Sequence, residues 1–263
     1  MVVLGQNANA IETIVGAAKA FAFLGRDYET IVVDNAKVGE APFVFDDENY
    51  KVKIVRSGSN VGFSRGANIG AKEARGDFFL FLNPDTSFPD EKSLPRLFAA
   101  ATKLPDEGAF APKLSFENGK EAPWGGYFHY RMHRLLGRFK PAWRLPALPE
   151  KGLLEVDWVA ATAMLVSRSS FLAVDGFAEE YYMFFEDVDI CHRFQKRNMK
   201  SFLVVDAEIV HQGGGTYRLS PQERKAADYR MSRVTFFKKY APIRGWLAGL
   251  LDLLPWGRYN RPQ

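Results

Sequence analysis

Two aspartates are placed where a carboxylate could do chemistry, because each follows a short run of β-branched or aromatic residues. Asp34 closes the run ETIVVD over 29–34, and Asp85 comes just after FFLFL over 78–82. Ligands of an open parallel sheet bind beyond the carboxyl ends of its strands, so both side chains would face one cleft. The alternative is local, since aspartate is also favoured in turns and helix caps.

Three more acids, Glu186, Asp187 and Asp189, stand between an aromatic stretch over 181–185 and a predicted helix over 187–197. Aromatic surroundings are partly apolar, and there the pKa of a carboxylate rises toward that of a useful general base. Capping is the competing interpretation, because acids in a first helical turn are stabilised by the helix dipole.

A histidine, His211, ends a later strand-like run and precedes a flexible glycine-rich loop. A lone histidine is usually structural. Beside several cleft carboxylates, however, an imidazole suits a divalent metal, so His211 is a candidate metal ligand.

Glycines recur at every fourth position in the segment 60–70, a spacing that matches neither the dinucleotide fingerprint nor the phosphate loop. It puts Gly66 and Gly70 on one face of a helix, which can then approach a strand or a ligand closely. Arg65 lies in the first turn of that helix, where it could meet a phosphate together with the helix amides. A tightly packed helix with a solvated Arg65 explains the spacing equally well.

Strand and helix patterns alternate in the first part of the chain. Strands are predicted over 2–5, 29–34, 51–55 and 78–82, and helices over 9–24, 64–75 and 91–102. An irregular stretch over 114–152 is followed by strand patterns over 156–166, 202–205 and 208–211, and by helices over 187–197, 222–240 and 243–256. The alternation predicts an α/β fold with a mostly parallel sheet flanked by helices.

The composition limits the class of protein. The chain has 263 residues, of which 47% are hydrophobic and 25% charged, as in ordinary globular proteins. Its single cysteine, Cys191, excludes a disulfide framework and a cysteine-rich zinc site. No apolar run is long enough for a membrane span, and the first ten residues lack a signal-peptide pattern. We therefore expect a cytoplasmic protein.

Basic residues are concentrated in two regions. Residues 218–263 contain ten Lys or Arg and three acids, and the aromatic-rich segment 124–144 contains five Lys or Arg and no acid. Such patches attract nucleic acid, anionic lipid headgroups or phosphorylated substrates, although a solvated face is the simpler explanation. The apolar stripe over 243–256 would lie in a membrane interface or dock on the domain. Peripheral contact with the inner face of the plasma membrane is one expectation.

Six motifs occur in a fixed order along the chain: DNA over 34–36, NVGFSRGANIG over 60–70, LNPDT over 82–86, VDW with AMLV over 156–166, GF with FEDVD over 176–189, and HQG over 211–213. Together they resemble the inverting GT-A glycosyltransferases of family 2, particularly the rhamnosyltransferase-like branch. The resemblance covers about residues 1–240. It implies a GT-A, Rossmann-like catalytic domain over 1–217 and a basic, amphipathic helical extension over 218–263.

The resemblance also implies roles around the nucleotide sugar. Asp34 would contact the nucleotide base or ribose, and Arg65 a base or phosphate. Asn83 and Asp85 stand in the position of the family's DXD motif, in which Asp85 would hold Mn2+ or Mg2+ against the diphosphate. The chain keeps only one aspartate of that motif.

The same resemblance assigns the chemical step. Within the Glu186-Asp187 pair, Asp187 would be the catalytic base, and His211 would be a second metal contact. Trp158 would lie where the donor sugar and the acceptor meet. The family's usual Thr-Tyr-Asn at the end of the first strand is Gly-Gln-Asn over 5–7 in this chain.

The expected function is the inverting transfer of a sugar, with rhamnose as one candidate, from a dTDP- or UDP-linked donor. The acceptor would be a hydroxyl of a glycan or lipid-linked molecule in cell-surface polysaccharide synthesis. Two alternatives remain: a catalytically inactive nucleotide-sugar-binding protein and a nucleic-acid-binding module. The preferred function, glycosyl transfer, involves no nucleic acid partner. A nicotinamide-dependent oxidoreductase is disfavoured because no GxGxxG follows the first strand. A retaining hydrolase would instead need two carboxylates about 5 Å apart, and without the family resemblance the sequence leaves this alternative open.

Overall fold

The computed structural model describes residues 1–263 except 123, 128–147, 213–221 and 241–263. The strands within these described residues form three sheets. The first contains β1 (Val2–Val3), β2 (Thr30–Asp34) and β3 (Val52–Arg56), all parallel. The second runs in the order β4 (Phe78–Leu82), β10 (Ala163–Ser167), β6 (Ala109–Ser115), β11 (Ser201–His211) and β5 (Thr86–Ser87), with β8 (Leu153–Val156) also on β11. The third pairs β7 (Gly125–Gly126) with β9 (Trp158–Val159).

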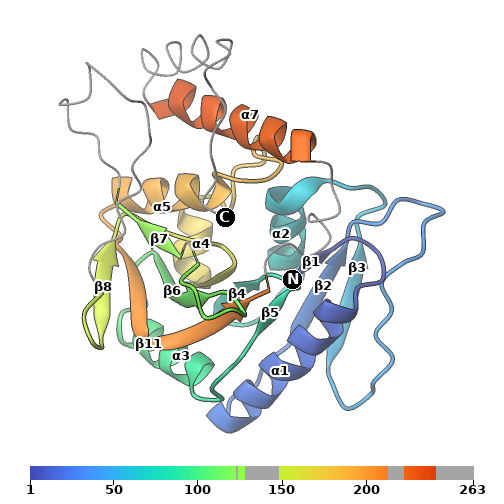
Figure 1. Ribbon diagram of the computed structural model, residues 1–263, viewed down its shortest axis with the longest axis horizontal. Coiled ribbons are helices and arrows are strands. Elements are labelled where there is room, and N and C mark those ends of the chain that lie inside the picture. The colour runs from blue at the N-terminus through green and yellow to red at the C-terminus, as the bar shows by residue number, and fades with distance from the viewer. Residues whose placement is uncertain (123, 128–147, 213–221, 241–263) are drawn as a thin grey trace.

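Helices cover these sheets, as the alternation of patterns predicts (Figure 1). They are α1 (Ala8–Leu24), α2 (Gly62–Glu73), α3 (Ser93–Lys103), α4 (Arg168–Ala173), α5 (Glu186–Lys196) and α7 (Gln222–Tyr240). The predicted α/β fold, with helices flanking a central sheet, is confirmed. Strand β11 runs parallel to β6, whereas β10 lies antiparallel between β4 and β6.

The fourfold glycine spacing serves packing. A Cβ on Gly66 would lie 2.9 Å from a methyl of Val2, and one on Gly70 would lie 3.2 Å from a methyl of Val33. Helix α2 therefore rests directly on β1 and β2, which is the structural interpretation of the spacing. This close contact brings the start of α2 to the carboxyl end of β2.

The strand predicted over 156–166 is broken into two. Strand β9 ends at Val159 and β10 starts at Ala163, so residues 160–162 form a turn. The runs over 202–205 and 208–211 are instead one strand, β11, with a shift of register between Val204 and Glu208. Both differences lie at the end of the sheet where the predicted acids gather.

Helix α7 packs on α5 at one end of the molecule, as seen at the top of Figure 1. The side chain of Phe236 is only 2% exposed and lies 5.6 Å, ring to ring, from Phe185. The ring of Tyr240 lies 4.2 Å from that of His192 in α5. The described part of the predicted extension over 218–263 is thus packed into the same core as the sheet, while the division at residue 217 stays a prediction.

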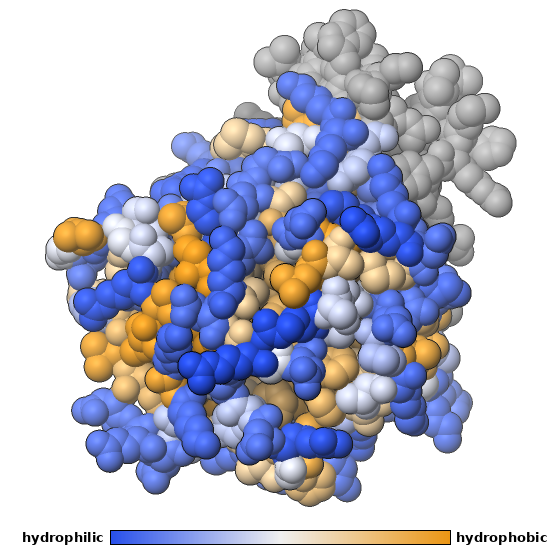
Figure 2. Space-filling model, turned by 180° about the vertical axis from the view of Figure 1, so that it is seen from behind, coloured by the Kyte–Doolittle hydropathy of each residue, from blue (hydrophilic) through white to orange (hydrophobic). Residues whose placement is uncertain are grey.

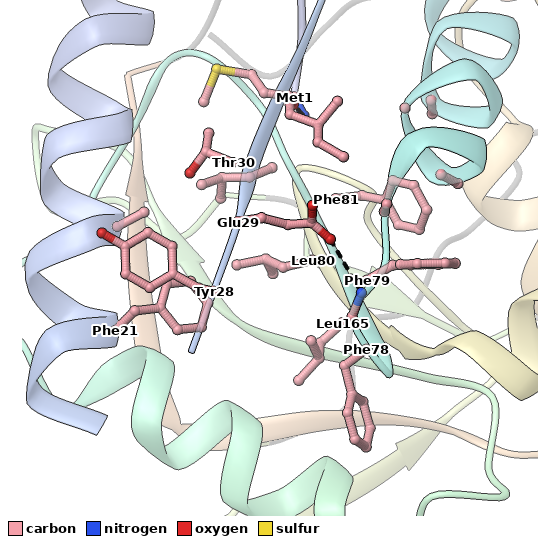
Figure 3. A pocket seen from close by; sticks show the side chains of 18 of the residues that line it. Met1, Phe21, Tyr28, Glu29, Thr30, Phe78, Phe79, Leu80, Phe81 and Leu165 are labelled. Atoms are coloured by element: carbon pink, nitrogen blue, oxygen red, sulfur yellow. Dashed lines mark hydrogen bonds between the residues drawn. The ribbon is translucent and has the colours of Figure 1, made fainter. Parts of the chain in front are cut away.

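A cavity of about 750 Å³ lies between the β1–β3 sheet and β4. Figure 3 shows Thr30 of β2 on one side of it and Phe79 and Phe81 of β4 on the other. Glu29 also lines it and accepts a hydrogen bond from the backbone N–H of Gly76 at 3.2 Å. None of the eight predicted site residues lines this cavity, so it is a feature of packing apart from the predicted chemistry.

The exposed large apolar side chains of the described residues lie on helices, a strand and the loop between β2 and β3: Phe23, Val38, Val44, Leu153, Leu172 and Met231. On the face in Figure 2, apolar residues lie in groups among hydrophilic ones. Among the described residues, no helix is both long enough and apolar enough to cross a membrane. The apolar stripe over 243–256 and the basic residues of 128–144 lie outside the described residues.

Candidate active site

Asp85 and His211 are brought together by the pairing of two strands. Thr86 of β5 is the partner of His211 in β11, so the residue before Thr86 lies beside the histidine. The backbone carbonyl of Asp85 accepts from the N–H of Gln212 at 2.9 Å, and its carboxylate Oδ2 lies 3.2 Å from His211 Nε2. The carboxylate is only 4% exposed, while the imidazole is 21% exposed. Solvent therefore reaches the Asp85–His211 pair from the side of the histidine.

A single turn joins the Asp85 segment to Asp187. The N–H of Asn83 donates to the carbonyl of Thr162 at 2.9 Å, and the N–H of Ala161 donates to Asp187 Oδ2 at 3.4 Å. Adjacent residues of the 160–162 turn therefore contact the two acidic motifs. The structure brings Asp85 and Asp187 to the same end of the β4–β10 pair, as one shared cleft requires.

The start of α5 presents Glu186 and Asp187 from a strained backbone. Phe184 and Phe185 have φ angles of +70° and +66°, a left-handed conformation that costs L-residues about 1–2 kcal/mol each. The chain reverses there, so α5 begins with both acids in its first turn. Such strain persists only where surrounding contacts hold it, and it is frequent at functional sites.

The environment raises the pKa of both carboxyl groups, those of Glu186 and Asp187. Burial raises the pKa of Asp187 from 3.8 to about 6, against the backbone hydrogen bonds from Val188 and Ala161, which lower it. Burial, and then the charge of Asp187, raise the pKa of Glu186 well above its usual value. Glu186 Oε2 is a buried oxygen with no hydrogen-bond partner among the described residues. A group with a pKa near 6 is a competent base at neutral pH.

Asp34 is committed to the backbone. Its Oδ1 accepts from the N–H groups of Gly5 and Ala36, both at 2.9 Å, and its Oδ2 accepts from Phe43 at 2.7 Å. The side chain is only 1% exposed. Three loops thus converge on one carboxylate at the end of β2, which is the turn-forming role that the sequence left open. Direct contact of Asp34 with a nucleotide stays a prediction.

Arg65 lies at the surface, paired with an acid that the sequence analysis missed. Its Nε donates to Glu179 Oε2 at 2.9 Å, and Asn68 Nδ2 donates to the other oxygen of Glu179 at 3.2 Å. These bonds hold α2 against the segment that leads to α5. The arginine side chain is 55% exposed, so it remains accessible to an anionic ligand. Glu179 carries no motif, and only the fold reveals it.

Trp158 is buried in the small β7–β9 sheet, with 8% of its surface exposed. Its backbone is the partner of Gly126, and a Cβ on Gly125 would come within 2.4 Å of the Trp158 carbonyl. Trp158 lies three positions before Ala161, on the same connection that contacts Asp187. Its predicted place between donor sugar and acceptor is not tested by these contacts.

The donor set suits a divalent cation bound with its substrate. No cluster of three or more His, Cys, Asp or Glu is placed to hold a metal ion anywhere in the described residues. Asp85 and His211 supply one carboxylate and one imidazole at 3.2 Å. Mg2+ is commonly held by one or two carboxylates together with substrate phosphates and water, so two protein ligands fit a diphosphate complex.

The sequence itself shows which family this is. The profile of glycosyl transferase family 2 matches residues 7–152, more than half of the chain. The chain belongs to glycosyl transferase family 2. This glycosyltransferase is 27% identical over 254 residues to the N-acetylglucosaminyl-diphospho-decaprenol L-rhamnosyltransferase of Mycobacterium tuberculosis, covering 87% of this chain and 82% of the relative. It is also 27% identical over 201 residues to the rhamnosyltransferase WbbL of Escherichia coli K12, covering 63% and 74%.

Solved structures agree on the fold of the glycosyltransferase. GalNAc-T7, crystallised with UDP, GalNAc and Mn2+, superposes with a TM-score of 0.57 at 14% identity, covering 80% of this chain and 43% of that one. The mannosyltransferase PcManGT of Pyrobaculum calidifontis, crystallised with GDP-Man and Mn2+, gives 0.54 at 12% identity, covering 95% and 63%. At these identities the likeness shows the fold alone, and it confirms the predicted GT-A fold.

Proposed function

We propose that this family 2 glycosyltransferase transfers a sugar from a nucleoside diphosphate donor to an acceptor hydroxyl in one inverting displacement. The observation that carries the proposal is the connection from Asp187 through the 160–162 turn to Asn83 and Asp85. Asp187 and Asn83 both contact this one small turn, which supports a base and a diphosphate-binding motif within one site. A single displacement needs a base on one side of the anomeric carbon and a stabilised leaving group on the other.

Asp187 is the proposed base. Val188 and Ala161 donate to its two oxygens, so the carboxylate is held in one orientation while it accepts the proton of the acceptor hydroxyl. Its pKa of about 6 leaves it mostly ionised at neutral pH yet more basic than an exposed aspartate. Glu186, whose raised pKa favours the protonated form, is placed to donate a hydrogen bond rather than to take up a proton.

Asp85 and His211 would hold Mn2+ or Mg2+ at the diphosphate. A bound divalent cation neutralises the charge that develops on a departing nucleoside diphosphate. The short contact of Asp85 with His211 keeps both side chains at the end of β5 and β11, and Asn83 is fixed by its bond to Thr162. Asp34 shapes the nucleotide end of the site by tying three loops together, and Arg65 is near enough to the surface to meet a phosphate.

Rhamnose from a dTDP-linked donor, with a UDP-linked sugar as the alternative, is the proposed transferred group, and a lipid-linked glycan the proposed acceptor. The support is the similarity to two rhamnosyltransferases, one of which is named for a lipid-diphosphate acceptor. The basic residues of α7 and of the segment beyond it would favour an anionic membrane surface at the inner face of the plasma membrane.

A panel of nucleotide sugars tests the proposal. The purified chain is heated with dTDP-rhamnose, UDP-glucose, UDP-N-acetylglucosamine or GDP-mannose, each with and without Mn2+, because a ligand that binds only the folded state raises Tm. The donor that stabilises most is then incubated with a lipid-linked glycan, and the anomeric configuration of the product is read by NMR. Stabilisation without transfer would instead support the inactive binding protein, and a retained anomer would exclude the single displacement.

A further inference from the structure

The loop over 181–185 sets where the acids stand, and its own residues do not explain its shape. Two consecutive left-handed phenylalanines, Phe184 and Phe185, precede Glu186. Neither has the conformational freedom of glycine, so the strain must be balanced by contacts from outside the loop. Those contacts come from two helices that are distant in sequence.

Helix α2 holds one side of the loop. The carbonyl of Tyr182 accepts from the N–H of Phe63 at 2.8 Å. A Cβ on Gly62 would approach the same carbonyl to 2.4 Å, so only glycine permits the contact.

Helix α7 holds the other side. Ser232 Oγ donates to the carbonyl of Met183 at 2.8 Å, and Ser232 is only 5% exposed. The ring of Tyr229 lies 5.7 Å from that of Phe184 and 5.4 Å from that of Phe185. The left-handed pair therefore packs directly under α7.

The end of α7 is tied to the first turn of α5 through Asp189. This carboxylate has no exposed surface, and it accepts from Tyr240 Oη at 2.7 Å, Lys239 Nζ at 3.0 Å, Tyr181 Oη at 3.2 Å and Arg193 Nε at 2.6 Å. Burial works to raise the pKa of Asp189, but the charge of Arg193 and these hydrogen bonds outweigh it and lower the pKa. A buried charge satisfied by four donors fixes the elements that supply them.

We propose that α7 is a positioning element for the reaction, in which Ser232, Lys239 and Tyr240 hold the 181–185 loop and the first turn of α5 and so place Asp187 for the acceptor hydroxyl. This inference rests on the proposed function. None of the three residues needs to touch the substrate. Misplacing a base by about 1 Å costs up to about a hundredfold in rate, so a modest loosening of this contact is measurable.

Two matched pairs of variants test the proposal. Lys239→Met is compared with Lys238→Met, because both remove one positive charge from the same turn, but Lys238 is exposed and makes no ion pair among the described residues. Ser232→Ala is compared with Thr235→Ala, because Thr235 Oγ1 donates only to Met231 of its own helix. Circular dichroism confirms that each variant is folded.

The first readout is kinetic. For Lys239→Met and Ser232→Ala we expect kcat to fall roughly tenfold while the donor KM stays within about twofold, and Lys239→Arg to recover part of the loss. A purely structural role would lower the active fraction of enzyme to the extent that the protein unfolds, with no rescue by arginine. Equal kcat in Lys239→Met and Lys238→Met would overturn the proposal.

The second readout needs no activity. Backbone amide hydrogen exchange over 182–188 should be faster in Lys239→Met and Ser232→Ala than in their matched controls, because the loop opens more often. If the wild type transfers no sugar, the proposed function fails, and this exchange comparison still decides whether α7 holds the loop. Unchanged exchange in both variants would show that it does not.

Discussion

Asp85 Oδ2 lies 3.2 Å from His211 Nε2, although 125 positions separate the two residues in the chain. The cause is strand register, because Thr86 is the direct partner of His211 in the β5–β11 pair. A shift of one residue would turn the histidine to the other face of β11 and separate the pair. The two-residue strand β5 thus determines whether the two proposed metal ligands lie together.

Removing the base should stop transfer and leave donor binding intact. In Asp187→Asn the amide cannot accept a proton at neutral pH, so kcat should fall at least about a hundredfold. The donor-induced rise in Tm should remain close to that of the wild type. Asp106→Asn, which changes an exposed acid far from the site, serves as the control. Wild-type turnover in Asp187→Asn would show that Asp187 is not the base.

Removing the proposed metal ligands should blunt the response to Mn2+ or Mg2+. Asp85→Ala should lose most of the metal-dependent rise in Tm with the donor present, because its carboxylate is the only charged ligand of the pair. His211→Ala should show a milder loss. Titration calorimetry with Mn2+ and the nucleoside diphosphate measures both affinities. An unchanged metal response in both variants would point to neutralisation of the diphosphate by Arg or Lys.

The pKa of Asp187 predicts opposite effects of pH on activity and on stability. Turnover should rise with pH through about 6, as the base loses its proton. Because the folded-state pKa lies above the unfolded value of 3.8, the native state is stabilised relative to the unfolded state below about pH 4, and this contribution is lost as pH rises to about 6.

Asp187→Asn should therefore be more stable than the wild type at pH 7.5, by an amount on the order of 1–3 kcal/mol for a shift of about two pKa units in a half-buried group. The gain should vanish below pH 4. Urea unfolding of both proteins at pH 7.5 and pH 4 measures it. Equal stability of the two proteins at pH 7.5 would indicate that burial does not raise the pKa of Asp187.

Substitution of Gly62 by alanine should lower the free energy of unfolding more than substitution of Gly58. Both have positive φ angles, +82° and +76°, but a Cβ on Gly58 meets nothing within 4 Å, whereas one on Gly62 would meet the Tyr182 carbonyl at 2.4 Å. Gly58→Ala should cost about 1 kcal/mol of backbone strain, and Gly62→Ala should cost more by roughly 1–3 kcal/mol. Urea unfolding compares the two. Equal costs would mean that α2 does not press on the 181–185 loop.

Association with anionic membranes is expected to depend on the segment after Tyr240. The full chain should pellet with anionic liposomes at low salt and not with neutral ones, since each Lys or Arg near such a surface contributes about 1 kcal/mol. A chain ending at Tyr240 should pellet less, because it lacks the apolar stripe over 243–256. If neither chain pellets at low salt, the acceptor is more consistent with a soluble glycan.

Local pattern was sufficient to predict five of the helices in the described residues and several of the strands, but it missed the short helix α4. Helix α1 runs from Ala8 to Leu24 against a prediction of 9–24, because Asn7 caps its start and Gly25 its end within the sequence itself. Buried strands such as β4 stand out as continuous apolar runs. The candidate site residues were equally readable, since Asp85 follows β4, Asp187 lies in the first turn of α5 and His211 ends β11.

The sequence by itself determined which residues could do chemistry and which elements carry them. Tertiary structure alone decided how those residues are used. Asp34 accepts hydrogen bonds from three backbone amides because the loops that carry Gly5, Ala36 and Phe43 meet at the end of β2. Arg65 pairs with Glu179 because α2 packs beside a segment more than a hundred positions away in the sequence. The left-handed Phe184–Phe185 pair packs against Tyr229 of α7. Each of these depends on contacts between distant segments, and propensities and periodicities of neighbouring residues carry no information about them.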